Sequence, residues 1–293
     1  EDIPLLEKYA NKNSVQGENG FITDFLGIRH SLGNWGENYK HLDGAHFENI
    51  PIPDDGFHAE AIEYISCFTS IENAGSTYTM FELGAGWGPW MSIAGTATKR
   101  RWGGGGVKQN NHNGVEGENN KIPLIKKHLT ANGLRPESDE LVSSLNNVNT
   151  IIYDGVVNAT GEDIAFPEVG VDAYGASLVE KTVARRTQPL KIVKGYSFKD
   201  ISGDYNRIDF VHLDLQGYEM EFVEKCIETL SEKVKYMFVG THTRKIEGDL
   251  FEFLYAHGWT LLREKPCEVH WPETAPDSFV DITVKDGGQF WKK

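Results

Sequence analysis

Residues 81–90 read FELGAGWGPW, and the rest of the chain is arranged around this stretch. The residues just before it, at 78–81, are apolar and β-prone, and those at 90–94 have the character of a helix that is starting. A strand, a glycine turn and a helix in this order form the opening unit of a Rossmann-like α/β fold. Its glycines let the backbone take positive φ angles and approach a ligand without a Cβ in the way.

The glycine spacing decides between kinds of nucleotide site. A dinucleotide fingerprint needs a third glycine where this chain has Pro89, and the G-K-[ST] of a phosphate loop is absent from the stretch. The pattern that remains is E-x-G-x-G-x-G, which is typical of S-adenosylmethionine (SAM) sites. A strand-to-helix turn that binds no ligand is the plainer alternative. The predicted contacts of SAM or S-adenosylhomocysteine (SAH) in this stretch are Glu82, Gly84, Gly86, Trp87 and Gly88.

Composition narrows the class of protein. The chain has 293 residues, 39% of them hydrophobic, which is enough for a real core. Its formal net charge of −14 argues against nucleic acid as a partner, because a surface that neutralises phosphates needs a basic excess. The sequence shows no apolar run near the ~20 residues of a membrane span and no signal-peptide pattern. Three isolated cysteines, Cys67, Cys226 and Cys267, predict buried thiols in a reduced, cytoplasmic protein.

Alternating elements after residue 57 predict one α/β domain. Strands are expected at 78–81, before 116, and at 147–153, 208–213, 234–239, 259–262 and 279–284; helices are expected at 58–69, from 90, and at 122–132, 219–230 and 249–257. A hairpin or excursion of lower order fills 161–196. This alternation predicts a Rossmann-like, mainly parallel twisted sheet with helices on both faces.

The first 70 residues are predicted to form an N-terminal extension, with the SAM-binding methyltransferase domain at 71–293. Up to about residue 56 the extension is rich in turn residues and aromatics, with too few periodic elements to bury a core of its own. We expect it to act as a lid on the acceptor side of the site. Trp35 and Tyr39 would stack on a sugar face, and His58 would meet its hydroxyls. The alternative is an extension that only shields an edge of the sheet.

Ligands of such sheets bind outside the carboxyl ends of the strands. Glu116 ends the second strand, followed by Gly117, and would accept hydrogen bonds from both ribose hydroxyls; NAD would need the same acid. Asp154, followed by Gly155, ends the third strand and would accept from the adenine amino group. Glu82 would meet the amino group of the methionine part. Asp214 and His242 follow the fourth and fifth strands. Asp214 is predicted both to bind the cofactor and to take part in catalysis.

Two stretches resemble the FkbM-type SAM-dependent methyltransferases. They are VEGENNKIPLIKKHLTANGL at 115–134 and IDFVHLDLQGYEMEFV at 208–223. The D-x-x-G-x-E core, at Asp214, Gly217 and Glu219, is the most specific part. Gln216 stands where the family usually has Glu, and Gly240 where it often has Glu. The resemblance covers about residues 78–262 and implies a class I methyltransferase fold, with O-methylation of a sugar or polyketide hydroxyl as the usual task.

The predicted reaction is methyl transfer from SAM to a hydroxyl of a sugar, a glycan or polysaccharide precursor, or a secondary metabolite. The protein must align the acceptor oxygen and remove a proton, directly or with a metal. A histidine suits proton transfer near neutral pH, so His242 is the predicted base, with Asp214 beside it. Gln216 is placed on the substrate side. Mg²⁺ held by Asp214 and His242 is possible. The alternatives are an N- or protein methyltransferase and a SAM-binding protein without transferase activity.

Overall fold

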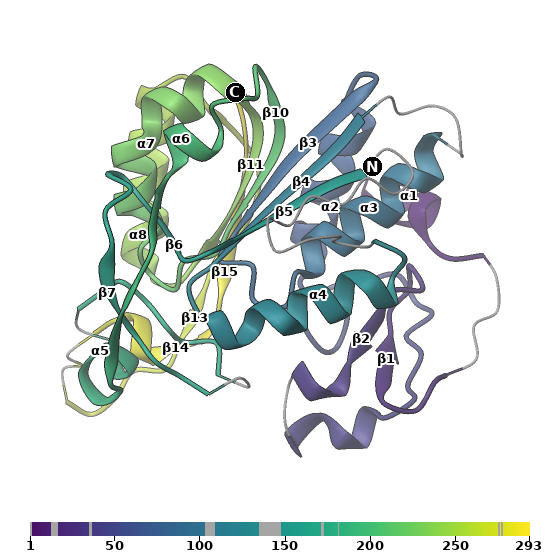
Figure 1. Cartoon of the computed structure of the whole chain (residues 1–293), viewed down its shortest axis with the longest axis horizontal. Helices are drawn as coiled ribbons and strands as arrows, with labels where there is room; N and C mark the ends of the chain where they lie inside the picture. The colour runs from purple at the N-terminus through teal and green to yellow at the C-terminus, as the bar shows by residue number, and fades with distance from the viewer. Residues whose placement is uncertain are drawn as a thin grey trace.

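The computed structural model describes residues 2–12, 17–34, 37–102, 109–134, 148–170, 173–180, 182–274, 276 and 278–293. Its centre is a seven-stranded sheet with the order β12-β15-β11-β10-β3-β4-β5 (Figure 1). The strands are β3 (Thr77–Leu83), β4 (Gln109–Glu116), β5 (Val148–Asp154), β10 (Ile208–Leu213), β11 (Val234–Thr241), β12 (Thr260–Lys265) and β15 (Gly287–Lys292). The middle strands are runs of buried residues, as expected for a sheet covered on both faces.

Strand direction follows the predicted pattern. β3 runs parallel to β4 and β10, β4 runs parallel to β5, and β10 runs parallel to β11. Only β15 is reversed in this sheet, since it pairs antiparallel with both β11 and β12. The prediction of a mainly parallel α/β sheet is therefore confirmed.

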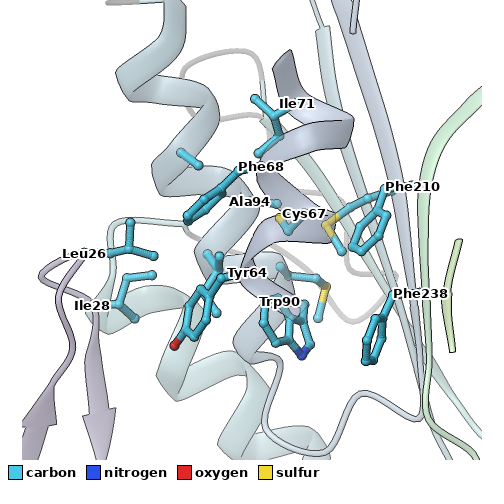
Figure 2. Close-up of a cluster of buried hydrophobic side chains, with 14 of the residues drawn as sticks. Leu26, Ile28, Tyr64, Cys67, Phe68, Ile71, Trp90, Ala94, Phe210 and Phe238 are labelled. Carbon is cyan, nitrogen blue, oxygen red and sulfur yellow. The ribbon is translucent and has the colours of Figure 1, made fainter. Parts of the chain in front are cut away.

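Helices cover the two faces of the sheet (Figure 1). One face carries α2 (Ala61–Glu72), α3 (Pro89–Trp102) and α4 (Ile122–Ala131), and the other carries α6 (Phe198–Ile201), α7 (Glu219–Lys233) and α8 (Arg244–Ala256). Neighbouring strand residues point to opposite faces. Phe210 accordingly joins the cluster under α2 and α3, where Phe68 and Trp90 lie (Figure 2), while Val211 joins the cluster under α7 and α8.

Local capping explains where two helices begin and end. The Thr243 side chain accepts a hydrogen bond from the backbone N–H of Ile246, so α8 begins at Arg244, five residues before the predicted start. Gly133 takes a φ of +73° directly after Asn132, the C-cap of α4, as its predicted role at the helix C-terminus requires.

The N-terminal segment shares the core of the domain. It contains α1 (Asp2–Tyr9), the antiparallel pair β1 (Phe21–Thr23) and β2 (Arg29–Ser31), and the 3₁₀ turns η1 (Leu32–Asn34) and η2 (Glu37–Leu42). Tyr9 stacks on Phe68 of α2 with ring centroids 4.4 Å apart. The Arg100 guanidinium of α3 donates to the carbonyls of Tyr9 and Leu26. The division predicted at residue 70 falls inside α2, which packs on the sheet.

The excursion expected at 161–196 is built from short elements at one end of the sheet. They are β6 (Val156–Asn158), β7 (Ile164–Pro167), α5 (Val183–Thr187), β8 (Leu190–Val193) and β9 (Gly195–Ser197). β7 and β8 form an antiparallel hairpin, and β6 pairs parallel with β9. The segment between β7 and α5 returns toward the carboxyl ends of the main strands, where three of its residues line a cavity: Tyr174, Ala176 and Leu178.

The predicted closing strand at 279–284 is wrong. Residues there form the 3₁₀ turn η5 (Val280–Ile282) and β14 (Thr283–Lys285), which pairs with β13 (Glu268–Val269) outside the main sheet. The strand that completes the sheet is β15, which begins with two glycines. A Cβ on Gly287 would lie 2.4 Å from Glu247 Oε1, and one on Gly288 would lie 2.7 Å from the Phe238 ring. These glycines permit close packing inside the strand.

Candidate active site

The glycine loop after β3 is fixed against two neighbouring strands. Gly84 and Gly86 take φ angles of +82° and +57°. A Cβ on Gly84 would lie 1.8 Å from the carbonyl oxygen of Asp214, and the backbone N–H groups of Gly84 and Ala85 donate to the carbonyl of Val115 at 3.0 and 2.9 Å. The loop therefore fits against the ends of β4 and β10 only without a side chain at position 84.

Glu82 joins β3 to the start of α3. Its two carboxyl oxygens accept hydrogen bonds from the backbone N–H groups of Trp90 at 3.1 Å and Met91 at 3.0 Å. Burial raises the pKa of Glu82 to about 8, although both N–H groups act in the opposite direction. A cation beside this carboxyl group would favour its charged form. The predicted contact with the amino group of the methionine part stays a prediction.

Glu116, at the end of β4, lies under the same loop. Its Oε2 accepts from the N–H of Gly86 and its Oε1 from the N–H of Glu118, both at 2.7 Å. Burial raises the pKa of Glu116, and the nearby Lys121 ammonium opposes that shift. An ionised carboxylate has about four lone-pair sites, so two remain for hydroxyl donors such as those of a ribose.

A cavity of about 250 Å³ opens beside the loop. The predicted residues that line it are Glu82, Gly84, Gly86, Trp87, Glu116, Gly117, Gly155 and Asp214, with His58 and Gln216 from the predicted substrate side. Apart from His58, which precedes α2, these residues lie at or just after the carboxyl ends of β3, β4, β5 and β10.

Other predicted residues are not in this lining. A Cβ on Gly88 would meet Ile125 at 3.0 Å, so this glycine serves the packing of α4. Asp154 is exposed and only the following Gly155 reaches the cavity. Tyr39 lines a different chamber, described below. Trp35 lies outside the described residues.

Asp214 is held by a tight turn after β10. The Nε2 of Gln216 donates to Asp214 Oδ1 at 2.8 Å, and Gln216 itself takes a φ of +54°. The buried Glu219 Oε1 accepts from the backbone N–H groups of Leu215 and Gly217, each at 2.9 Å. Glu219, the last residue of the D-x-x-G-x-E pattern, thus stabilises the turn that positions Asp214, the first residue of the pattern.

His242 lies among carboxylates. Its Nδ1 is 2.9 Å from Glu219 Oε1, and its Nε2 is 3.4 Å from Asp214 Oδ1 and 3.7 Å from Asp286 Oδ2. Burial alone would lower the pKa of His242, but Glu219, Asp214 and Asp286 outweigh it and raise this pKa to about 10. A general base must be neutral and reach the acceptor. The three carboxylates favour the charged form of the imidazole, and His242 is absent from the linings of both cavities, so its surroundings favour a role in charge balance. Its role as the base stays a prediction.

Asp214, Glu219 and His242 also form the group, within the described part of the chain, whose side chains could each offer one atom to a metal, all within 4.8 Å of one another. The set does not fit Mg²⁺ well. Mg²⁺ demands near-ideal octahedral oxygen coordination. Here one of three donors is nitrogen, and Glu219 Oε1 already serves two N–H groups and the imidazole.

A second chamber of about 570 Å³ adjoins the first. The residues that line both are His58, Ala59, Glu63, Asp214 and Asp286. Its other walls come from residues 54–62, with Tyr39, and from the turn between β14 and β15. His58 is fixed there by an ion pair with Asp55, whose carboxyl also accepts from the Tyr64 hydroxyl at 2.9 Å. The predicted substrate residues Tyr39 and His58 therefore lie at this chamber.

Several lining residues were not predicted. Lys121, Tyr174, Ala176, Leu178 and Tyr218 line the first cavity, and Glu63 and Asp286 lie where the two chambers meet. Lys121 belongs to the 3₁₀ turn η4 (Asn119–Lys121) directly after the Glu116 strand end, so its position in the chain was a usable signal. Tyr174 comes from the excursion, where no local pattern indicates a site.

The sheet order, in which the reversed strand β15 lies between β11 and β12, and the glycine loop over Glu116 define a class I, Rossmann-like methyltransferase fold. A protein of Jannaschia sp. (strain CCS1) described as "Putative methyltransferase" is 34% identical to this chain over 254 residues, covering 85% of each. The chain belongs to this methyltransferase family. No family model matches the sequence.

Two solved structures with low sequence identity are also similar. The C-terminal domain of precorrin-6Y C5,15-methyltransferase from Rhodobacter capsulatus is 11% identical, with a TM-score of 0.41 over 81% of this chain and 91% of that one. The methyltransferase FkbM from Methylobacillus flagellatus KT is 12% identical, with a TM-score of 0.42 over 74% of this chain and 44% of that one. The fold assignment rests on the strand order above. Across the described residues, the helices are too short or too polar to cross a membrane.

Proposed function

We propose that this methyltransferase is a SAM-dependent O-methyltransferase of the FkbM type, acting on a hydroxyl of a sugar, a glycan or polysaccharide precursor, or a secondary metabolite. The observation that carries the proposal is the junction of two chambers at Asp214. One chamber has the loop and carboxylates expected around SAM, and the other is polar and large enough for an acceptor. The turn from Asp214 to Glu219 supports the FkbM assignment.

The first cavity would hold the cofactor. Glu116 would bind the ribose hydroxyls, the glycine loop would lie along the nucleoside, and Glu82 and Asp214 would face its positive charges. When bound, SAM supplies an activated methyl group on a sulfonium. The cavity is lined by five acidic side chains, which in their charged forms are electrostatically complementary to such a cation: Glu63, Glu82, Glu116, Asp214 and Asp286.

The acceptor would enter through the second chamber. We infer that Asp214 takes the hydroxyl proton as the new carbon–oxygen bond forms and the carbon–sulfur bond breaks, leaving SAH. His242 would act through Asp214, since its Nε2 lies 3.4 Å from Asp214 Oδ1 and the surrounding carboxylates favour the charged form of the imidazole. In this proposal the base is Asp214, which lines both chambers, and not His242.

An assay with methyl-tritiated SAM tests the function. The acceptor panel contains methyl glycosides, oligosaccharides, nucleotide sugars, polyketide alcohols and primary amines. We expect label on an oxygen of a sugar or alcohol, located by mass spectrometry of the product. Label on nitrogen alone would reject O-methylation. SAH binding without transfer to any of these classes would support the non-catalytic alternative, to which the departures at Gln216 and Gly240 point.

The second candidate is N-methylation. The acceptor chamber includes Asp54, Glu63, Asp214 and Asp286. Its two lysines are paired: Lys265 with Glu60 at 2.6 Å and Lys285 with Glu268 at 3.6 Å. An acidic chamber favours a protonated amine, so the amines in the panel decide between the two reactions.

Replacing Glu116 by Ala should weaken SAH binding by roughly 1.5–3 kcal/mol, the range for hydrogen bonds to a charged group. The matched control is Asp154→Ala, because Asp154 is the register partner of Glu116 on β5 but is exposed. Titration calorimetry should show a loss of affinity for the Glu116 variant and none for the Asp154 variant. Equal affinities for Glu116→Ala and wild type would remove Glu116 from the cofactor site.

We keep the acceptor-side lid as a proposal for the N-terminal segment. Tyr39 and residues 54–60 form part of the second chamber, which supports contact of this segment with the acceptor. A test by deletion would fail on stability grounds, since Leu6, Tyr9 and Phe25 belong to the main core. Point substitution of Tyr39 is the suitable experiment.

A further inference from the structure

The roof of the cofactor cavity is built differently from its walls. The walls are strand ends and the glycine loop, whereas the roof comes from residues 173–178 of the excursion, here called the roof segment. Its residues Tyr174, Ala176 and Leu178 line the cavity. The sheet itself fixes the walls, so the roof segment needs contacts of its own to stay in place.

Tyr174 makes those contacts on its ring. The ring meets Trp87 of the glycine loop edge to face, with centroids 5.3 Å apart and an interplanar angle of 77°. A Cβ on Gly86 would lie 3.4 Å from Tyr174 Cε1, which is ordinary van der Waals distance. Tyr174 therefore lies directly on the loop that is proposed to hold SAM.

Lys121 braces the same ring from the side of Glu116. Its Nζ lies 3.6 Å from the centroid of Tyr174 and donates to the carbonyl of Ala173 at 2.6 Å. Lys121 is 3% exposed, and a desolvated cation–π contact of this kind is stronger than one at the surface. The ammonium is also close enough to Glu116 to oppose the rise in the pKa of that carboxyl group. One buried lysine thus links the roof to the predicted ribose contact.

The hydroxyl of Tyr174 ties the roof to the N-terminal segment. It donates to the carbonyl oxygen of Asn34 at 2.8 Å, a contact across 140 positions of sequence. Three separate parts of the chain thus hold one side chain: the glycine loop, the turn after β4 and the N-terminal segment.

From this geometry we propose that Tyr174 is a cofactor-binding residue, which closes the cavity over the glycine loop and is held there by Lys121 and the Asn34 carbonyl. The proposal rests on the proposed function only in taking SAM or SAH as the ligand. It assigns to the N-terminal segment a second task, the retention of the cofactor, besides contact with an acceptor.

The test uses SAH, the full chain and four proteins: wild type, Tyr174→Ala, Tyr174→Phe and the control Tyr255→Ala, whose side chain on α8 is 56% exposed and outside both linings. Titration calorimetry gives Kd. Stopped-flow tryptophan fluorescence gives the rate of SAH release, because Trp87 lines the cavity that would hold SAH. We expect Tyr174→Ala to raise Kd about 10-fold through faster release, since it loses both ring and hydroxyl contacts. Tyr174→Phe should raise Kd about 3-fold by losing the hydroxyl alone.

The outcomes separate the two levels of inference. Absence of SAH binding by wild type would reject the proposed cofactor, whatever the variants do. Wild-type binding with a Kd for Tyr174→Ala within twofold of wild type would overturn the role of Tyr174. A fall in melting temperature with unchanged Kd would assign Tyr174 to folding alone and also overturn the proposal. If the Ala variant does not fold, Tyr174→Leu replaces it, because Leu keeps apolar bulk on the loop but loses the hydroxyl and the cation–π partner.

Discussion

Gly84→Ala should destabilise the protein by about 2–5 kcal/mol and abolish SAH binding in the fraction that remains folded. The backbone at this position has a φ of +82°, where an L side chain costs about 1–2 kcal/mol. The new Cβ would also lie 1.8 Å from the carbonyl oxygen of Asp214, so the glycine loop and the turn after β10 must separate. These are the two elements on which the proposed cofactor and acceptor sites meet.

A second glycine provides the matched control. Gly248 lies within α8, and a Cβ there would meet nothing within 4 Å. Gly248→Ala should therefore stabilise the protein by about 0.5–1 kcal/mol, the usual gain for Ala over Gly inside a helix. Urea unfolding measures both free energies and calorimetry measures SAH binding. A Gly84→Ala protein with wild-type stability and affinity would show that the loop does not hold the described geometry.

His242→Gln should cost about 3–5 kcal/mol of stability, the range for removing one partner of a buried ion pair. The Glu219 carboxylate, which is fully buried, would lose the cation 2.9 Å away. Turnover should also fall, because Asp214 loses the ring beside it. The control is His257→Gln, at the exposed C-terminal cap of α8, which loses a hydrogen bond to the Phe253 carbonyl. Its stability should fall by only about 0.5–1.5 kcal/mol and its turnover should not change.

The free energy of unfolding contributed by His242 should decrease as pH rises. In the unfolded chain the imidazole loses its proton near pH 6.5, whereas in the folded protein its pKa is raised to about 10. The stabilisation from His242 is therefore fully present below pH 6.5 and is lost as pH rises through about 10. Urea unfolding at pH 6, 8 and 10 should show the difference between wild type and His242→Gln shrinking with pH. Wild-type stability with reduced turnover in His242→Gln would instead support the base predicted from sequence.

Sequence reasoning located the sheet and one half of the site because both depend on local patterns. The strand at 208–213 was predicted residue for residue, since four of its six residues are apolar and β-prone and Asp214 follows it directly. The proximity of Glu116 to the glycine loop was predicted from a general rule, because parallel strands present their carboxyl ends at one edge of the sheet. The fold class needed little more than this alternation of strands and helices.

The other half of the site depends on contacts between distant parts of the chain. Tyr174 meets Lys121 and Asn34 through side-chain geometry that no local periodicity records. The pKa of His242 is set by Asp286, from the turn before β15, as well as by the two acids of the motif. A closing strand was predicted at 279–284 and none at 287–292, so no sequence pattern brought Asp286 next to His242.

The stacking of Tyr9 on Phe68 and the hold of Arg100 on the carbonyls of Tyr9 and Leu26 have a consequence for protein engineering. A segment that contributes to an acceptor chamber is an obvious cassette to exchange between related enzymes. Here the cassette cannot be moved alone, because Phe68 of α2 and Arg100 of α3 hold it in place. A chimera would have to carry Phe68 and Arg100 along with the donor segment, so new acceptor specificity and the repacking of the core would have to be selected together.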